Sequence, residues 1–242
     1  MDKIKIGNKK IEYRLIRTKR KTIGIYIRPG EGVLIRAPQR ISNKKIQEVL
    51  FKKSNWIITK LEEVSKVLPP PVPLKFVNGE QIPYLGEYYE LRIQSNGDKK
   101  GVIIDFDKIY FNIFINKNIE YKDKRNLVKD SLIRWYRKQA GCKINERVEK
   151  YQEYIGKKPV NIRIKNQKTI WGSCSSRGNL NFNWKLIMAP LPVLDYIVVH
   201  ELVHLLYPNH SRRFWDFVEE IIPEYRDRKE WLKINGLLLN II

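Results

Sequence analysis

The first forty residues alternate apolar and polar positions in short runs, as β-strands with one buried face do. Two runs, in KIKIGNKKIEYRLI, flank Gly7-Asn8, which favours a hairpin turn. Two more, TIGIYIRP and GVLIRAP, flank a turn cluster at residues 29–32. Ser42 can cap the helix that follows. Its apolar residues fall on one face of that helix: Ile46, Val49, Leu50, Ile57, Leu61 and Val64.

The proline-rich segment LPPPVP, residues 68–73, ends this helix and predicts a stiff connector. Strands return in KFVNGEQIPYLGEYYELRIQ, GVIIDF and IYFNIF. Residues 122–155 then predict one long helix or two, closed by Gly156.

Helices dominate the remainder of the chain, after two strand-like runs, VNIRIK and GNLNFN. Pro192 suits the first turn of a helix through VLDYIVVHELVHLL. Ser211 can cap the next helix, RRFWDFVEEII, and a last one follows Pro223. The pattern therefore predicts an α+β fold with a strand-rich N-terminal half and a mostly helical C-terminal half.

We expect a boundary between residues 1–118, a strand-rich region with one long helix, and residues 119–242, unless the two regions share one continuous domain. No internal repeat is evident. No apolar run approaches the roughly 20 residues that a membrane helix needs. The N-terminus lacks the apolar core of a secretory signal, and two cysteines make no disulfide framework. A cytoplasmic location is therefore expected by default.

The chain is strongly basic, with 47 Lys and Arg against 26 Asp and Glu, a net charge of +21. Such an excess favours nucleic acid or another polyanion as a partner, through long-range attraction and counterion release. The alternative is compositional drift in a lysine-rich proteome, which the many Ile, Asn and Lys residues also fit.

All three histidines lie in one stretch of eleven residues, HELVHLLYPNH, at positions 200–210. His200 and His204 are four residues apart on the predicted helix, so both imidazoles face the same side and can bind one metal ion. Glu201 completes an H-E-x-x-H pattern, in which the carboxylate takes a proton from a metal-bound water.

A catalytic zinc site needs a third protein ligand and one open position. Pro208-Asn209 should end the helix and turn the chain, which can bring His210 back to the metal. The spacing H-x3-H-x5-H matches the metzincins, except that Tyr207 stands where their motif has glycine. Glu219 and Glu220 are rival ligands, and the alternative to a metal site is a helix whose histidines only pack or cap. That alternative is disfavoured, because unliganded imidazoles and a glutamate are costly to bury in so apolar a helix.

Two longer stretches, WGSCSSRGNLNFNWKLIMAP and YIVVHELVHLLYPNHSRRFWDFVEEIIPEY, resemble the YgjP-like metallopeptidase family, which is related to the SprT and Wss1-like zinc proteases. Weaker likeness in the N-terminal half extends the resemblance over most of the chain. It implies a zincin-like C-terminal part, residues 119–242, with an active-site helix beneath a small sheet. It also implies Zn²⁺ held by His200, His204 and His210, with Glu201 as general base.

The family's other marker is the segment from Trp171 to Ser175. It predicts a loop beside the zinc, with GNLNFN as the edge strand that pairs with an extended substrate. The alternative is a tight turn that packs Trp171 and Cys174 into the core, and for Cys174 we favour it. Asp195 and Asp216 are candidates to orient a histidine N–H. We expect Phe214-Trp215 to be core packing beneath the metal helix.

The sequence thus predicts a zinc-dependent metallohydrolase, a peptidase that acts on a protein or peptide with a metal-activated water. Two alternatives stay open. One is a metal-dependent nucleotide pyrophosphohydrolase, although no P-loop is evident. The other is a non-catalytic module that binds zinc or nucleic acid, against which the intact Glu201 argues. No membrane partner is expected.

Overall fold

A computed structural model describes residues 2–6, 9–28, 32–68, 71–95, 97, 101–116, 118 and 121–242. The chain divides into two compact units, Met1–Pro70 and Pro71–Ile242, and each unit has its own hydrophobic core. The proline-rich connector expected at 68–73 spans the division, and residues 69–70 lie outside the described part. The boundary expected at 118/119 falls inside the second unit.

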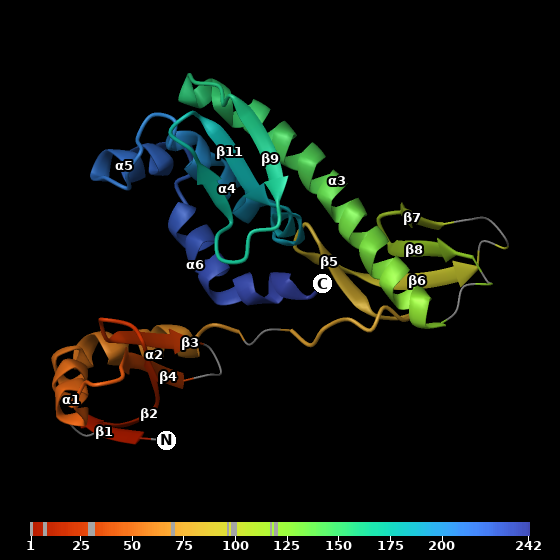
Figure 1. Ribbon diagram of the computed structural model, residues 1–242. Helices are drawn as coiled ribbons and strands as arrows, with labels where there is room; N and C mark the ends of the chain where they lie inside the picture. The colour runs from red at the N-terminus through yellow and green to blue at the C-terminus, as the bar shows by residue number, and fades with distance from the viewer. Residues whose placement is uncertain are drawn as a thin grey trace. The chain divides into compact units, whose positions relative to one another are not determined.

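The first unit is a four-stranded sheet followed by two helices (Figure 1). Its elements are β1 (Asp2–Ile6), β2 (Lys9–Thr18), β3 (Gly24–Arg28), β4 (Gly32–Pro38), α1 (Asn43–Lys52) and α2 (Ser54–Ser65). The strand order is β1-β2-β4-β3, with β2 and β4 parallel. The Ser42 side chain caps α1 by accepting from the Lys45 N–H at 3.2 Å, as expected.

The single helix expected after Ser42 is two helices, which meet at Lys53. Its apolar period continues across the break, because Ile46, Leu50 and Ile57 all enter the same core. Periodicity therefore found the buried face of both helices and could not find the break. Of the turns expected at residues 7–8 and 29–32, residues 7–8 and 29–31 lie outside the described residues.

The second unit begins with a sheet that has the strand order and directions of the first. Its order is β5-β6-β8-β7, with β6 and β8 parallel. The strands are β5 (Gln81–Tyr84), β6 (Glu87–Ser95), β7 (Val102–Phe106) and β8 (Tyr110–Ile115). This repetition of topology has no counterpart that we detect in the sequence.

The 35-residue helix α3 (Tyr121–Ile155) connects this sheet to the rest of the second unit. It is one helix, and Gly156 ends it with a φ of +68° and an N–H that donates to Gln152 O at 3.0 Å. Figure 1 shows α3 running past both sheets of the unit, and one side of α3 contributes to the common core: Val128, Leu132, Tyr136, Ala140, Ile144, Val148, Tyr151 and Ile155.

A three-stranded sheet and three further helices complete the second unit. The strands are β9 (Asn161–Lys165), β10 (Gly172–Cys174) and β11 (Asn179–Asn183), in the order β10-β11-β9. The helices are α4 (Leu191–Val203), α5 (Arg212–Ile221) and α6 (Tyr225–Asn235), with short 3₁₀ turns η1 (Trp184–Met188) and η2 (Gly236–Asn240). The fold is thus α+β, as expected. No helix in the described part of the chain combines the length and apolarity needed to cross a membrane.

The strand order corrects one expectation. GNLNFN forms β11, the central strand, so it is not the edge strand that the sequence suggested. The edge strands are β9 and β10, and β10 comes from the family marker segment itself. Sequence alone could not rank the two, because strand order depends on pairings between segments rather than on local pattern.

Candidate metal centre

Helix α4 carries the first histidines through the middle of the core. It begins after Pro190, with Pro192 in its first turn, and nearly all its residues are buried. A helix that is apolar all round belongs inside a protein. Its polar side chains include Asp195 and Glu201, which are buried, and His200, which is half-buried like His204 at the C-cap.

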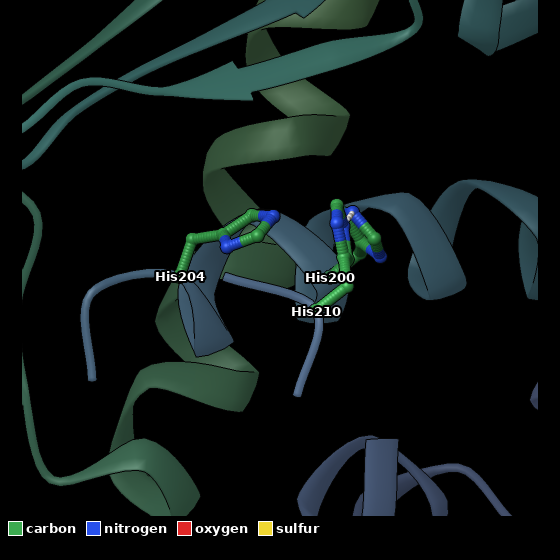
Figure 2. Close-up of side chains that lie close together, drawn as sticks. All are labelled: His200, His204 and His210. Atoms are coloured by element: carbon green, nitrogen blue, oxygen red, sulfur yellow. Dashed lines mark hydrogen bonds between the residues drawn. The ribbon is translucent and has the colours of Figure 1, made fainter. Parts of the chain in front are cut away.

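The chain turns sharply after α4 and returns His210 to the other two histidines. The Leu205 N–H donates to Leu202 O and the Tyr207 N–H to Val203 O, both at 2.9 Å. The Ser211 hydroxyl then caps α5 by accepting from the Phe214 N–H. One ligand atom from each histidine lies within 4.8 Å of the others, and Nε2 of His210 is 3.0 Å from Nε2 of His200 (Figure 2).

The ring nitrogens that face away from this cluster differ in their hydrogen bonding. Nδ1 of His204 lies 3.0 Å from the carbonyl oxygen of Tyr207, so it carries the proton and leaves Nε2 free to bind a metal. Nδ1 of His200 is buried and has no hydrogen-bond partner within the described structure. Burial lowers the pKa of His200 to about 3, helped by His204, and burial also lowers the pKa of His210. Neutral imidazoles keep the lone pair that a metal needs.

Two aromatic side chains pack against the three histidine rings. Phe214 is fully buried, and its ring centroid lies 5.0, 4.6 and 4.8 Å from those of His200, His204 and His210. Trp215 stacks on His210 with the ring centroids 5.4 Å apart. The expectation of core packing holds for Phe214, and both aromatic side chains also fix the orientation of the histidine rings.

Glu201 follows His200 directly and is 4% exposed. In the metal-free protein, burial raises the pKa of its carboxyl to about 8. A divalent cation held by the neighbouring histidines would favour the ionised carboxylate. Its neighbour across the cleft is Gly172 of β10, the second residue of the family marker segment. The marker segment therefore lies beside the histidine cluster, as one reading of the sequence expected.

A cavity of about 770 Å³ opens between α4 and β10. All three histidines and Glu201 line it on one side, and Gly172, Ser173 and Cys174 line it on the other. Cys174 also packs against the core. Its burial, and then the charge of Glu201, raise the pKa of the thiol, which does not suit a nucleophile.

The two carboxylates proposed to orient the histidines, Asp195 and Asp216, pair with arginines instead. Asp195 accepts from Arg147 Nε and Nη2 at 2.6 and 2.7 Å and from the Tyr151 hydroxyl at 3.0 Å. Asp216 is exposed and lies 3.7 Å from Arg212. Helical position allowed both assignments, but the partners come from elsewhere: a backbone carbonyl orients His204. Among the rival ligands, Glu219 pairs with Arg226.

Two features of the site were not foreseen. Gly172 gives Glu201 its space, and Lys157 reaches the cavity wall with Nζ donating to Leu205 O at 2.7 Å. The WGSC motif in the sequence pointed to Gly172, whereas no motif in the sequence pointed to Lys157. Three imidazoles that converge on one point, with an open cavity in front, suit a divalent metal with room for a further ligand.

Comparison with known proteins gives one match along most of the chain. The YgjP-like metallopeptidase domain matches residues 21–235. Among solved structures, the metallopeptidase zymogen abylysin of Pyrococcus abyssi is 26% identical, with a TM-score of 0.35, over 38% of this chain and 92% of that one. The zymogen jannalysin of Methanocaldococcus jannaschii is 24% identical, with a TM-score of 0.34, over 38% and 88%. Among curated proteins nothing matches.

Proposed function

Because the chain belongs to the YgjP-like metallopeptidase family, we propose that it is a zinc-dependent peptidase with Glu201 as its general base. Its zinc ligands are His200, His204 and His210. The observation that carries the proposal is the convergence of these three side chains beside a buried glutamate in one open cavity. The active-site helix α4 beside a small sheet gives the second unit a zincin-like arrangement.

The residues divide the chemistry between them. The metal, when bound, supplies Lewis-acid polarisation of the scissile carbonyl and of the attacking water. Glu201 accepts a proton from that water as its oxygen bonds to the carbonyl carbon. It then delivers the proton to the amine nitrogen as the C–N bond breaks. The tautomer of His204 is held by the Tyr207 carbonyl throughout.

An extended peptide fits the free edge of β10. Gly172, Ser173 and Cys174 line the cavity, and on the side away from β11 this strand pairs with no other in the described chain. A peptide added there gains backbone hydrogen bonds whatever its sequence. The scissile bond would then lie over α4.

The nucleotide alternative is less well supported by the cavity. Of the described residues that line it, Lys157 is the only lysine or arginine, and it already donates to a carbonyl. A triphosphate site would be expected to have several such cations or a carboxylate cluster for magnesium. A non-catalytic role leaves the placement of Glu201 in the cavity unexplained.

The basic charge favours a nucleic-acid partner for the first unit. Residues 1–70 hold 18 of the 47 Lys and Arg but six of the 26 Asp and Glu. Strand alternation sends Ile11, Tyr13 and Val33 into the core, and the alternate positions, such as Arg14 next to Tyr13, to the other face. We name this the outer face: on β2 and β4, Arg14 and Arg36 are exposed there, and the Arg36 guanidinium lies 5.6 Å from the centroid of the Tyr26 ring. Arginines beside an aromatic ring suit phosphates and stacked bases.

The peptidase assignment is tested by Glu201→Gln. Gln keeps the shape of the side chain but cannot take the proton, so we expect kcat on an unfolded casein-like protein to fall by about 10²–10⁴-fold. Cleavage is followed by mass spectrometry, and elemental analysis should find the same zinc content in both proteins. Wild-type turnover by the zinc-loaded variant would exclude Glu201 as the base. Nucleoside triphosphates serve as the second substrate class.

A further inference from the structure

The Glu201 carboxylate is positioned by packing alone. It is buried, yet it has no hydrogen bond or ion pair with any residue in the described part of the chain. A buried carboxylate is usually held by several donors. The surfaces that touch Glu201 therefore decide where its oxygens lie.

Gly172 supplies the tightest of these surfaces. A Cβ atom built on Gly172 would lie 2.5 Å from Oε1, 2.6 Å from Cγ and 2.8 Å from Cδ of Glu201. Gly172 does not have a positive φ, so the backbone does not require glycine there. Space for Glu201 is the requirement that remains.

Strand β10 has little freedom to move away from this contact. The Asn183 N–H donates to Trp171 O at 2.8 Å, and its side-chain amide donates to Gln167 O at 2.8 Å. Trp171 packs on Gly236, where a Cβ would lie 3.1 Å from its ring. The segment is thus held by Asn183 and Gly236, and we expect a larger residue at 172 to displace the carboxylate instead.

We propose that Gly172 is the positioning residue for the Glu201 carboxylate: its bare Cα lets β10 press the carboxylate into its place beside the three histidines. This inference rests on the proposed role of Glu201 as general base, but the contact itself does not. A Cβ at position 172 pushes the carboxylate along the cavity and leaves the three histidines in place.

The experiment is Gly172→Ala, assayed in two ways. A displacement of about 1 Å can cost about 10²-fold in rate, so we expect a fall of that size in kcat, with KM and zinc content little changed. The second readout is the urea midpoint of the metal-free protein. Gly172→Ala should lower this midpoint when residue 201 is Glu and leave it unchanged in a Glu201→Ala background, where the displaced atoms are gone.

Gly141→Ala is the matched control. It lies in α3, where the nearest atom to a new Cβ would be 3.8 Å away, so neither kcat nor the midpoint should fall. If Gly172→Ala does not fold but the double variant does, the contact is established by that rescue.

Equal midpoint shifts in both backgrounds would overturn the contact. Coupled midpoints with an unchanged kcat would overturn the positioning role. An inactive wild-type protein with coupled midpoints would refute the proposed peptidase function and leave the contact supported, so the two failures are distinguishable.

Discussion

His210 makes the difference between a metal site with three ligands and a helix that merely carries two neighbouring histidines. Four-residue spacing brings His200 and His204 together on α4, but His210 reaches them only because the chain turns after Val203 and α5 begins at Arg212. Its ring also packs against the rings of both His200 and Trp215, with centroids 4.9 and 5.4 Å away. We therefore expect His210 to contribute to metal affinity as a full ligand.

Replacing His210 by Ala should remove the third donor and with it the bound zinc. Second-sphere changes alone typically cost 10–100-fold in metal affinity, and loss of a ligand should cost more. Elemental analysis after gel filtration measures the zinc per chain. Glu219→Gln is the control, because Glu219 is the rival carboxylate and pairs with Arg226 instead. A full complement of zinc in His210→Ala would remove His210 from the site.

At the scale of the residue, the sequence predicted which residues cluster but not the contacts that position their side chains. The i, i+4 spacing is a property of one helix, so His200 and His204 could be paired from the sequence. The contact of Gly172 with Glu201 joins segments that meet only in the folded chain. Phe214 and the Tyr207 carbonyl act through the turn after α4, and residue spacing alone does not give the geometry of that turn. For the same reason Asp195 was assigned to a histidine although its partners lie on α3.

At the scale of the elements, a buried ion pair joins helices α3 and α4. Arg147 and Asp195 form two hydrogen bonds, and their side chains are 13% and 9% exposed. The Asp195 carboxylate raises the pKa of the guanidinium, so Arg147 is charged at any ordinary pH. A buried pair of this kind is costly to break by halves, because the remaining charge has no partner.

Asp195→Ala should therefore lower the free energy of unfolding by about 3–5 kcal/mol. The paired change Arg147→Met with Asp195→Leu should cost much less, because no charge is then left buried. Urea denaturation followed by circular dichroism measures both. Exposed Asp216→Ala, on the neighbouring helix α5, is the control and should change the stability little. Equal losses in the single and paired variants would mean that the ion pair itself stabilises the fold.

The positions of helices and strands along the chain were the most predictable feature of this structure. The order of the strands in the sheets was the least predictable. Ser42, Ser211 and Gly156 mark helix ends through local hydrogen bonds, which sequence encodes directly. Which strand lies at an edge depends on distant pairings, and so β10 rather than β11 came as a correction.

At the scale of the whole molecule, charge is distributed unevenly between the two units. Residues 1–70 have 12 more basic than acidic residues, from 18 Lys and Arg against six Asp and Glu, and they supply more than half of the +21. Drift in composition would add lysines to every exposed surface alike. A bound polyanion would instead depend on one face, and the face with the arginine–tyrosine contact is the outer face of the first sheet.

Two charge-reversed variants of equal net charge separate these explanations. Arg14→Glu with Arg36→Glu changes the outer face, and Lys44→Glu with Lys52→Glu changes exposed positions of α1 on the opposite, helix-covered side. Each phosphate contact on a single strand contributes about 0.7 to the slope of log affinity against log salt. Loss of two contacts should reduce the slope by about 1.4, which is about 25-fold in affinity at 0.1 M salt relative to 1 M.

The measurement is fluorescence anisotropy with a labelled 20-nucleotide single strand, a duplex of the same length, and polyglutamate. We expect the arginine variant to lose affinity for the single strand and the α1 variant to keep most of it. The long-range field is the same for both proteins, so the difference isolates direct contact with the outer face. Equal losses would mean that the charge acts only as a diffuse field. Polyglutamate bound as tightly as the nucleic acid would show that the outer face does not select phosphates, and the first unit would then recruit acidic proteins to the peptidase rather than nucleic acid.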